Sequence, residues 1–179
     1  MKNSSAILLI GLGNPILGDD GVGWQIVKNI EEIYVDSDAQ LSGLDIVIDY
    51  LSLGGLSLME RMDGYNDVIV VDAIQTGVNP IGTIYSLPLS QLPNYSTGHS
   101  TAIHDTSLAT ALEVGRKMGM ILPEDVWVFG IEAENVYEFS ETLTPEIESV
   151  IPSTVKIIVE SLSQGIRQEK IIPPPSDNN

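Results

Sequence analysis

The sequence contains no cysteine and few basic residues. Its 179 residues include 8 Lys and Arg against 25 Asp and Glu, which gives a formal net charge of −17. The absence of cysteine excludes a disulfide framework, a zinc finger, an iron–sulfur cluster and a cysteine nucleophile. The shortage of bases argues against nucleic acid and anionic membrane as partners, because both are bound through clustered Lys and Arg.

Long apolar runs are also missing. No run approaches the ~18 residues that a membrane-spanning helix requires, so we expect no membrane insertion. The first residues form a poor signal peptide, since Asn14 and Asp19 interrupt the short apolar stretch, and we expect a cytoplasmic protein. The hydrophobic content of 43% nevertheless excludes a disordered acidic chain. We predict one domain over residues 1–166 and a flexible, proline-rich tail over residues 167–179.

The charge imbalance arises as much from missing bases as from added acids. The stretch from Met62 to Glu113 contains no Lys or Arg, but it does contain Asp63, Asp67, Asp72 and Asp105. Two interpretations stay open at this point. The stretch is either an ordinary acidic surface or a region whose field favours a cation.

Short β-branched runs alternate with longer amphipathic stretches, a pattern that predicts an α/β protein. Strands are expected over residues 6–10, 45–50, 67–73, 82–87 and 126–131. Helices are expected where apolar residues recur at helical spacing, over residues 21–34, 52–62, 105–118 and 144–164. Prolines bracket the run 82–87, so we expect that strand near an edge of the sheet.

Two adjacent carboxylates lie in a glycine-rich turn after the first predicted strand. The segment from Gly11 to Gly23 reads GLGNPILGDDGVG. It fails the dinucleotide pattern G-x-G-x-x-G at Ile16, and acidic residues at a helix start would repel a pyrophosphate. One of Asp19 and Asp20 can cap the helix, which leaves the other to point from the sheet edge into a crevice.

Two further polar residues are placed to meet this turn. Asp72 ends the apolar run Val68–Val71, and ligands of parallel sheets bind beyond the carboxyl ends of the strands. His104 precedes the helix expected from Asp105, so its ring can project toward the same edge. Two carboxylates and one imidazole match a divalent transition-metal site with open positions. Each residue also has an ordinary interpretation, as a loop cap for Asp72 and as a packed or exposed side chain for His104.

Other catalytic motifs are absent from the sequence. There is no G-x-S-x-G elbow for a serine nucleophile and no EF-hand loop for calcium. Glu132 and Glu134 follow the last predicted strand, where they either support a site or remain solvated. The sequence does not indicate a function for the second histidine, His99.

Five segments together resemble the hydrogenase maturation endopeptidases. They are GLGNPILGDDGVG at 11–23, DA at 72–73, HDTSL at 104–108, GIE at 130–132 and LTPEI at 143–147. The resemblance implies a three-layer α/β/α sandwich with a mostly parallel central sheet, of the phosphorylase/hydrolase-like type. It also implies an endopeptidase that removes the C-terminal extension of a nickel–iron hydrogenase large-subunit precursor after nickel insertion.

Carried over residue by residue, the resemblance places the metal ligands on Asp20, Asp72 and His104, with Asp19 as a supporting acid. In the family these ligands contact the nickel that the precursor presents, and zinc or cadmium are other divalent metals that such a site can hold. Two mechanisms stay open. The metal either activates the attacking water, or it only docks the substrate while Asp20 or Asp72 supplies acid–base catalysis of the aspartic type.

The sequence departs from the family pattern in one loop. Many members follow the second strand with Asp-Gly-Gly-Thr, whereas this chain has DYLSLGG at residues 49–55. We expect this loop to contact the substrate protein.

Two other functions stay open on the sequence. The opening GLGNP at residues 11–15 also resembles the peptidyl-tRNA hydrolases, but the Asp pair replaces the rest of their motif and no basic face exists for tRNA. A non-catalytic nickel checkpoint or chaperone for the same precursor is the second alternative. It would carry the same ligands without cutting the precursor.

Overall fold

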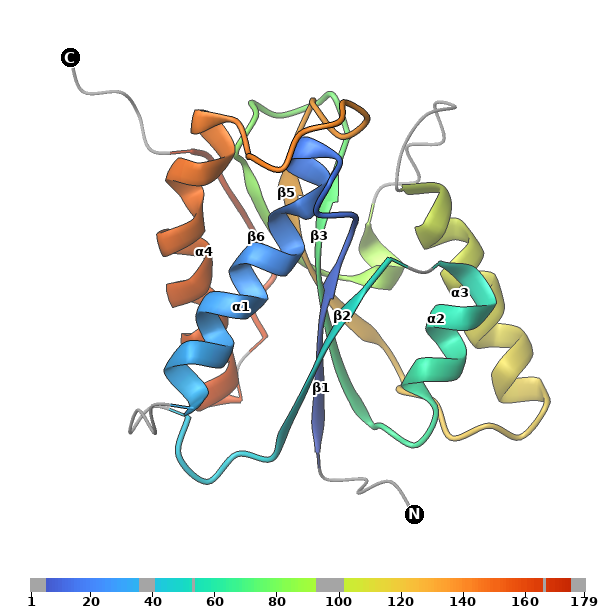
Figure 1. Cartoon of the computed structure of the whole chain (residues 1–179). Helices are drawn as coiled ribbons and strands as arrows, with labels where there is room; N and C mark the ends of the chain where they lie inside the picture. The colour runs from blue at the N-terminus through green and yellow to red at the C-terminus, as the bar shows by residue number, and fades with distance from the viewer. Residues whose placement is uncertain (1–5, 36–40, 53, 93–101, 166, 175–179) are drawn as a thin grey trace.

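A central sheet with helices on both faces organises the chain (Figure 1). The computed structural model describes residues 6–35, 41–52, 54–92, 102–165 and 167–174, and over residues 102–107 it describes the backbone alone. The strands are β1 (Ile7–Leu12), β2 (Ile46–Leu51), β3 (Asp67–Ile74), β4 (Ile84–Pro88), β5 (Val126–Glu132) and β6 (Lys170–Ile172). The helices are α1 (Val22–Val35), α2 (Gly55–Met62), α3 (Ala102–Lys117) and α4 (Pro145–Gln164), with short 3-10 turns η1 (Gly18–Gly21) and η2 (Leu89–Gln91).

The strands lie in the order β2-β1-β3-β5-β4-β6. β1, β2, β3 and β5 run parallel, whereas β4 is antiparallel to both β5 and β6. The prediction of a mostly parallel sheet is therefore confirmed. The carboxyl ends of β1 and β3 meet at one edge of the sheet, which is the upper edge in Figure 1.

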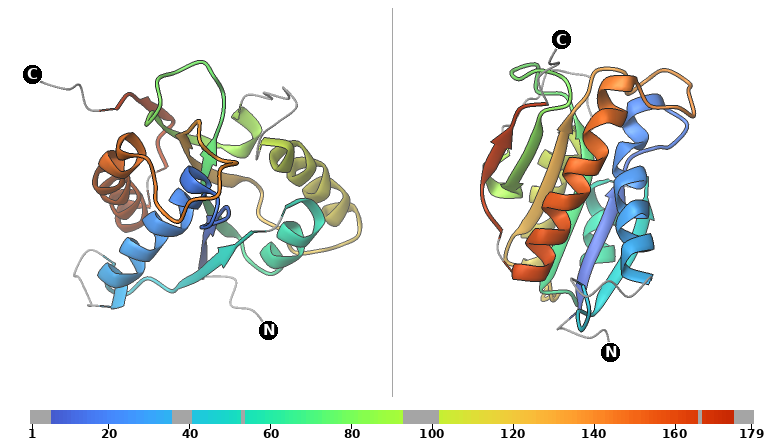
Figure 2. Two further views of the ribbon diagram at one scale, coloured as in Figure 1. Left: turned by 45° about the horizontal axis from the view of Figure 1, so that its top comes forward. Right: turned by 90° about the vertical axis from the view of Figure 1, so that its left-hand side faces the viewer.

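Helices α1 and α4 cover one face of the sheet, and α2 and α3 cover the other (Figure 2). Alternate residues of each central strand enter the two cores, so that Leu9 and Val71 pack toward α1 and α4 while Leu8 and Val70 pack toward α2 and α3. Burial on both faces explains why these strands read as continuous apolar runs. The three-layer α/β/α arrangement is confirmed.

Helix α4 follows its sequence signals closely. Thr144 occupies the N-cap position, Pro145 is the first helical residue, and Gly165 ends the helix in the left-handed conformation with φ 60°. Helix α3 differs from the prediction, because it begins at Ala102 rather than at Asp105. His104 therefore lies within the first turn of α3 instead of before it.

The C-terminal segment differs from the expected flexible tail. Lys170–Ile172 form β6, which pairs with β4. Further contacts hold the residues before it, since Arg167 forms a 2.9 Å ion pair with Asp67 and Ser86 Oγ donates a 2.9 Å hydrogen bond to the carbonyl of Gln168. The unpaired side of β4 supplies the backbone partners that bring this segment into the sheet.

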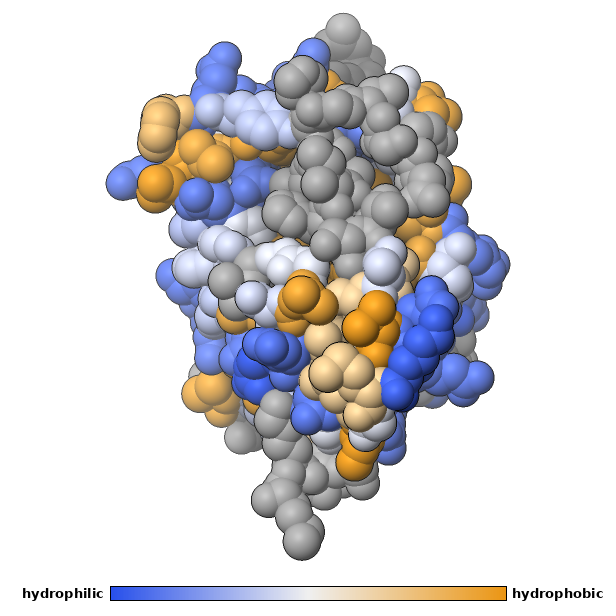
Figure 3. Space-filling model, turned by 90° about the vertical axis from the view of Figure 1, so that its right-hand side faces the viewer, coloured by the Kyte–Doolittle hydropathy of each residue, from blue (hydrophilic) through white to orange (hydrophobic). Residues whose placement is uncertain are grey.

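The outer face of α2 and α3 carries apolar side chains among polar ones (Figure 3). Among the described side chains, the exposed large hydrophobic residues of this layer are Leu56, Val114, Met118 and, in the loop after α3, Ile121. Scattered apolar side chains are normal on protein surfaces. None of the helices in the described ranges is long and apolar enough to cross a membrane.

Candidate active site at the carboxyl edge of the sheet

The turn between β1 and α1 brings two predicted carboxylates to the carboxyl edge of the sheet. η1 holds Asp19 and Asp20, which are only 1% and 5% exposed. Asp20 Oδ2 accepts a 2.6 Å hydrogen bond from the backbone N–H of Asn14. η1 packs against β3, the strand that carries Asp72, and Asp72 is 2% exposed. Buried carboxylates of the turn and of β3 therefore share one edge of the sheet.

Close backbone contacts explain the glycines of this turn. A Cβ on Gly13 would collide with the carbonyl oxygen of Asp20, and a Cβ on Gly23 would collide with the carbonyl oxygens of Leu12 and Val71. Gly13 also has a φ of 120°, which residues with a side chain rarely adopt. The glycines thus let the start of α1 lie directly on β1 and β3, and this packing fixes the Asp pair above the strand ends.

Asp19 connects the turn to α4. The backbone N–H of Thr144 donates to Asp19 Oδ1 at 2.7 Å, and the Thr144 hydroxyl lies 3.0–3.1 Å from the two carboxylate oxygens. Thr144 makes no side-chain cap within its own helix. The backbone N–H of Asp19 donates to the carbonyl of Asn135 at 3.0 Å. Asp19 therefore holds the turn against the start of α4.

Asp72 faces the layer of α2 and α3. Val68 and Val70 pack into the core on that side, and alternation along a strand gives Asp72 the same direction. α3 begins at the same end of the sheet (Figure 1), with the backbone of His104 in its first turn. The His104 side chain and the whole of His99 lie outside the described residues. Among the described side chains no group of three or more His, Cys, Asp or Glu is arranged to hold a metal ion, so the triad stays a prediction.

Tyr137 lies in the loop between β5 and α4, within the electrostatic influence of Asp20, and is 54% exposed. Burial raises the pKa of the Tyr137 hydroxyl, and the negative charge of Asp20 raises it further. The loop is attached to the turn, since Gly18 N–H donates to the Ser140 carbonyl at 2.8 Å and Ser140 N–H donates to the Ile16 carbonyl at 3.1 Å. Sequence reasoning missed Tyr137, and an aromatic residue shortly after the GIE segment was the available signal.

Glu132 is a buried structural carboxylate, whereas Glu134 is exposed. Glu132 Oε1 accepts hydrogen bonds from the backbone N–H groups of Thr76 and Gly77 at 2.8 and 2.9 Å. Its Oε2 accepts hydrogen bonds from the hydroxyls of Thr76 and Tyr85 at 2.5 and 2.7 Å. Burial raises the pKa of Tyr85, so this hydroxyl remains a donor at neutral pH. Glu132 thereby fixes the loop that follows β3.

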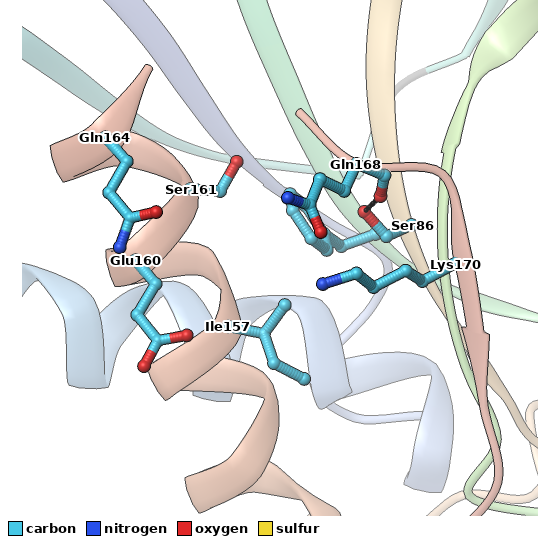
Figure 4. A pocket seen from close by; sticks show the side chains of 8 residues that line it. Ser86, Ile157, Glu160, Ser161, Gln164, Gln168 and Lys170 are labelled. Carbon is cyan, nitrogen blue, oxygen red and sulfur yellow. Dashed lines mark hydrogen bonds between the residues drawn. The ribbon is translucent and has the colours of Figure 1, made fainter. Parts of the chain in front are cut away.

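Two hollows border the turn. One has a volume of about 330 Å³ and is lined by Pro15, Trp24, Gln25, Lys28, Glu31 and Tyr50. The other has a volume of about 450 Å³ and is lined by Asp19, Ile81, Glu134, Asn135, Glu138, Thr144 and Glu146. A third cavity of about 80 Å³ lies between α4 and the strands β4 and β6, with Glu160 and Lys170 in its wall (Figure 4).

The chain matches a known family over most of its length. A family model described as hydrogenase maturation protease matches residues 26–161. The chain belongs to the hydrogenase maturation protease family. The family prediction is thus confirmed, and this maturation protease is a peptide-bond hydrolase. The match favours this function over the peptidyl-tRNA hydrolase resemblance.

Individual relatives of this maturation protease carry names of the same kind. The hydrogenase 2 maturation protease of Escherichia coli (strain K12) is 28% identical over 161 residues, which cover 89% of this chain and 92% of the relative. The hydrogenase expression/formation protein HupD of Rhizobium leguminosarum bv. viciae is 27% identical over 156 residues, which cover 87% of this chain and 73% of the relative.

Solved structures agree with the fold of this maturation protease. The hydrogenase maturating endopeptidase HybD from E. coli superposes with a TM-score of 0.71 at 26% identity, and the match covers 94% of this chain and 97% of HybD. The maturation protease HycI from Thermococcus kodakarensis KOD1 has a TM-score of 0.60 at 19% identity, and the match covers 90% of this chain and 94% of HycI.

Proposed function

We propose that this protease removes the C-terminal extension of a nickel–iron hydrogenase large-subunit precursor after nickel has been inserted. The observation that carries the proposal is the burial of Asp20 and Asp72 at the edge of the sheet where α3 begins, with His104 in its first turn. The relatives named as proteases of hydrogenase maturation support the choice of substrate.

We assign Asp20, Asp72 and His104 to recognition of the nickel that the precursor carries. Carboxylate oxygens and an imidazole nitrogen suit a divalent transition metal, and zinc or cadmium would be accepted by the same donors. The chain offers no thiolate, because it contains no cysteine. Three hard or borderline donors favour a transient contact with the metal of the substrate over its permanent storage.

Hydrolysis of the peptide bond requires a group that accepts the proton of the attacking water. In our proposal a carboxylate of the Asp20 and Asp72 pair takes this role. The nickel of the substrate supplies polarisation of the scissile carbonyl. Asp19 acts as a positioning residue, because its hydrogen bonds from Thr144 keep the turn, and therefore Asp20, in place.

The test is mass spectrometry of the purified precursor after incubation with the enzyme, with and without nickel in the precursor. We expect the mass of the C-terminal extension to be lost only from the nickel-loaded precursor. Asp20→Asn, Asp72→Asn and His104→Ala should each lower the cleavage rate by about 100-fold or more. Asp67→Asn is the matched control, since Asp67 lies at the opposite end of the same strand as Asp72 and should leave cleavage unchanged.

Three outcomes would contradict parts of this assignment. A stable complex with an uncut, nickel-loaded precursor would favour the non-catalytic nickel checkpoint. Equal cleavage of the nickel-free precursor would exclude recognition of nickel. Full activity of His104→Ala would remove His104 from the site.

A further inference from the structure

The outer edge of β2 is open to an additional strand. β2 stands at the end of the sheet and, among the described strands, pairs with β1 alone. Its odd-numbered residues bond to β1, as in the 3.1 Å hydrogen bond from Gly13 N–H to the Leu51 carbonyl. Residues of a parallel strand direct their backbone groups alternately to either side, so those of Ile46, Ile48 and Tyr50 point outward.

A groove of about 330 Å³ borders this edge on the side of α1. The rings of Trp24 and Tyr50 lie 5.4 Å apart in its wall. Hydrogen bonds hold both rings, since Trp24 Nε1 donates to the Leu51 carbonyl at 3.2 Å and the Tyr50 hydroxyl donates to Glu31 Oε2 at 2.6 Å. The groove therefore offers fixed aromatic surface next to a free strand edge, a combination that suits an extended peptide.

The groove continues into the catalytic turn. Pro15 lines the groove and lies close to Gly21 of the turn. Ser52, directly after β2, donates its hydroxyl to the Gly13 carbonyl at 2.7 Å. A peptide that runs along β2 therefore reaches the end of the strand beside the turn that holds Asp20.

We propose that the precursor adds a segment of its chain as an extra strand on the outer edge of β2, with a side chain in the groove. The proposal rests on the proposed function, because it takes the precursor as the occupant. Backbone hydrogen bonds to β2 would supply affinity, and the side chains that enter the groove would supply selectivity.

The charges of the groove indicate the chemistry of this segment. Lys28 is one of only 8 basic residues in a chain of net charge −17, and it lines the groove. The carboxylate of Glu31 already accepts the hydrogen bond from Tyr50. The segment therefore carries an apolar or aromatic side chain for Trp24 and Tyr50, and a carboxylate for Lys28.

Amide hydrogen exchange measured by NMR tests the added strand. The probe is the nickel-free precursor, which the proposed function leaves uncut. We expect its binding to slow exchange at the amides of Ile46, Ile48 and Tyr50 by about 10-fold or more, while the amides of Val47 and Asp49, which face β1, stay unchanged. Binding without protection at Ile46 and Ile48 would overturn the proposal.

Charge reversal tests the groove. Lys28→Glu should weaken binding of the precursor by about 3- to 10-fold, because an attractive contact becomes repulsive. Lys156→Glu is the matched control, since Lys156 is an exposed lysine on α4 and its replacement makes the same change in net charge. Equal affinities of the two variants would contradict a role for Lys28.

The outcomes separate this inference from the proposed function. Protection of the β2 amides without cleavage of the nickel-loaded precursor would reject the proposed function and keep the docking edge. Normal cleavage of the nickel-loaded precursor without protection of the β2 amides would reject the docking edge and keep the proposed function. Protection of Ile46 and Ile48 before the precursor is added, together with a dimeric mass, would show a second copy of the chain on β2 and would overturn the proposal.

Discussion

Asp19 and Asp20 are neighbours in one turn, but their carboxylates have different partners. Asp19 accepts hydrogen bonds from Thr144 at the start of α4. Asp20 accepts one from Asn14 within the turn itself. The sequence indicates that one acid of such a pair supports the helix and that the other serves a site. It does not indicate which, because the deciding partner, Thr144, is 125 residues away.

Asp19→Ala should lower the free energy of unfolding by about 1–3 kcal/mol, because it removes the buried carboxylate that accepts the hydrogen bond of the partly buried Thr144 N–H. Urea denaturation measures the effect. Glu141→Ala is the control, since Glu141 is exposed and lies in the loop before α4, and it should change stability by less than about 0.5 kcal/mol. Equal stabilities of the two variants would show that the contact with Thr144 contributes nothing.

Glu132 offers a second contrast between neighbouring acids. Glu132→Gln should destabilise the protein by about 1–3 kcal/mol, because an amide nitrogen replaces one oxygen of a carboxylate that accepts hydrogen bonds from Thr76, Gly77 and Tyr85. Glu134→Gln, the same change at an exposed position, should be nearly neutral. Thermal unfolding of both variants measures the difference, and a neutral Glu132→Gln would contradict the role of this carboxylate in fixing the loop after β3.

At the scale of elements, the contact of α1 with β1 and β3 decides the geometry of the site. The helix begins so close to both strands that the position of Gly23 has no room for a methyl group between the carbonyls of Leu12 and Val71. A backbone carbonyl in a sheet cannot move aside as a side chain can. The packing of α1 against β1 and β3 therefore determines where the turn with Asp19 and Asp20 lies.

Gly23→Ala should destabilise the protein by about 3 kcal/mol, at the upper end of overpacking effects, and should also slow precursor cleavage. Gly115→Ala is the control within another helix. The nearest atoms to its new Cβ are the ends of the flexible side chains of Leu122, Met59 and Met120, so we expect a change of less than about 1 kcal/mol. Chemical denaturation compares the two, and a stable Gly23→Ala would contradict the close contact.

Most elements could be predicted from the sequence because their signals are local. Buried apolar runs mark β1 and β3, and Thr144, Pro145 and Gly165 mark the ends of α4. β6 has only three residues and no periodicity, and it exists because β4 offers a free side. The effect of the Asp20 charge on the pKa of Tyr137 likewise arises between segments that are distant in the chain.

At the scale of the whole molecule, acidic side chains greatly outnumber the cations that could pair with them. Ion pairs in the described part of the chain include Arg61 with Asp49, Lys117 with Glu113, Lys156 with Glu160 and Arg167 with Asp67. The sequence has 25 acidic residues but only 8 Lys and Arg, so one-to-one pairing could neutralise only a minority of the carboxylates. Mutual repulsion among them opposes the compact state.

Added salt should therefore stabilise the protein. Screening shortens the Debye length to about 3 Å at 1 M salt, so we expect the melting temperature to rise by about 2–4 °C for each kcal/mol of repulsion removed. Differential scanning calorimetry in NaCl from low to high concentration measures the rise. An unchanged or lower melting temperature would show that attractive ion pairs dominate the net electrostatics.

The two ends of the sheet also set how copies of this protein can associate at high concentration. β6 is a poor template for another chain, because it spans three residues, begins with Lys170 and is followed by Pro173 and Pro174, which have no N–H to donate. β2 is the longer of the two edge strands, with six residues against three. A molecule with one usable strand edge can pair with one other copy through that edge, but the resulting pair has no further edge to offer. Association through the sheets therefore ends at two molecules and does not lead to a fibre.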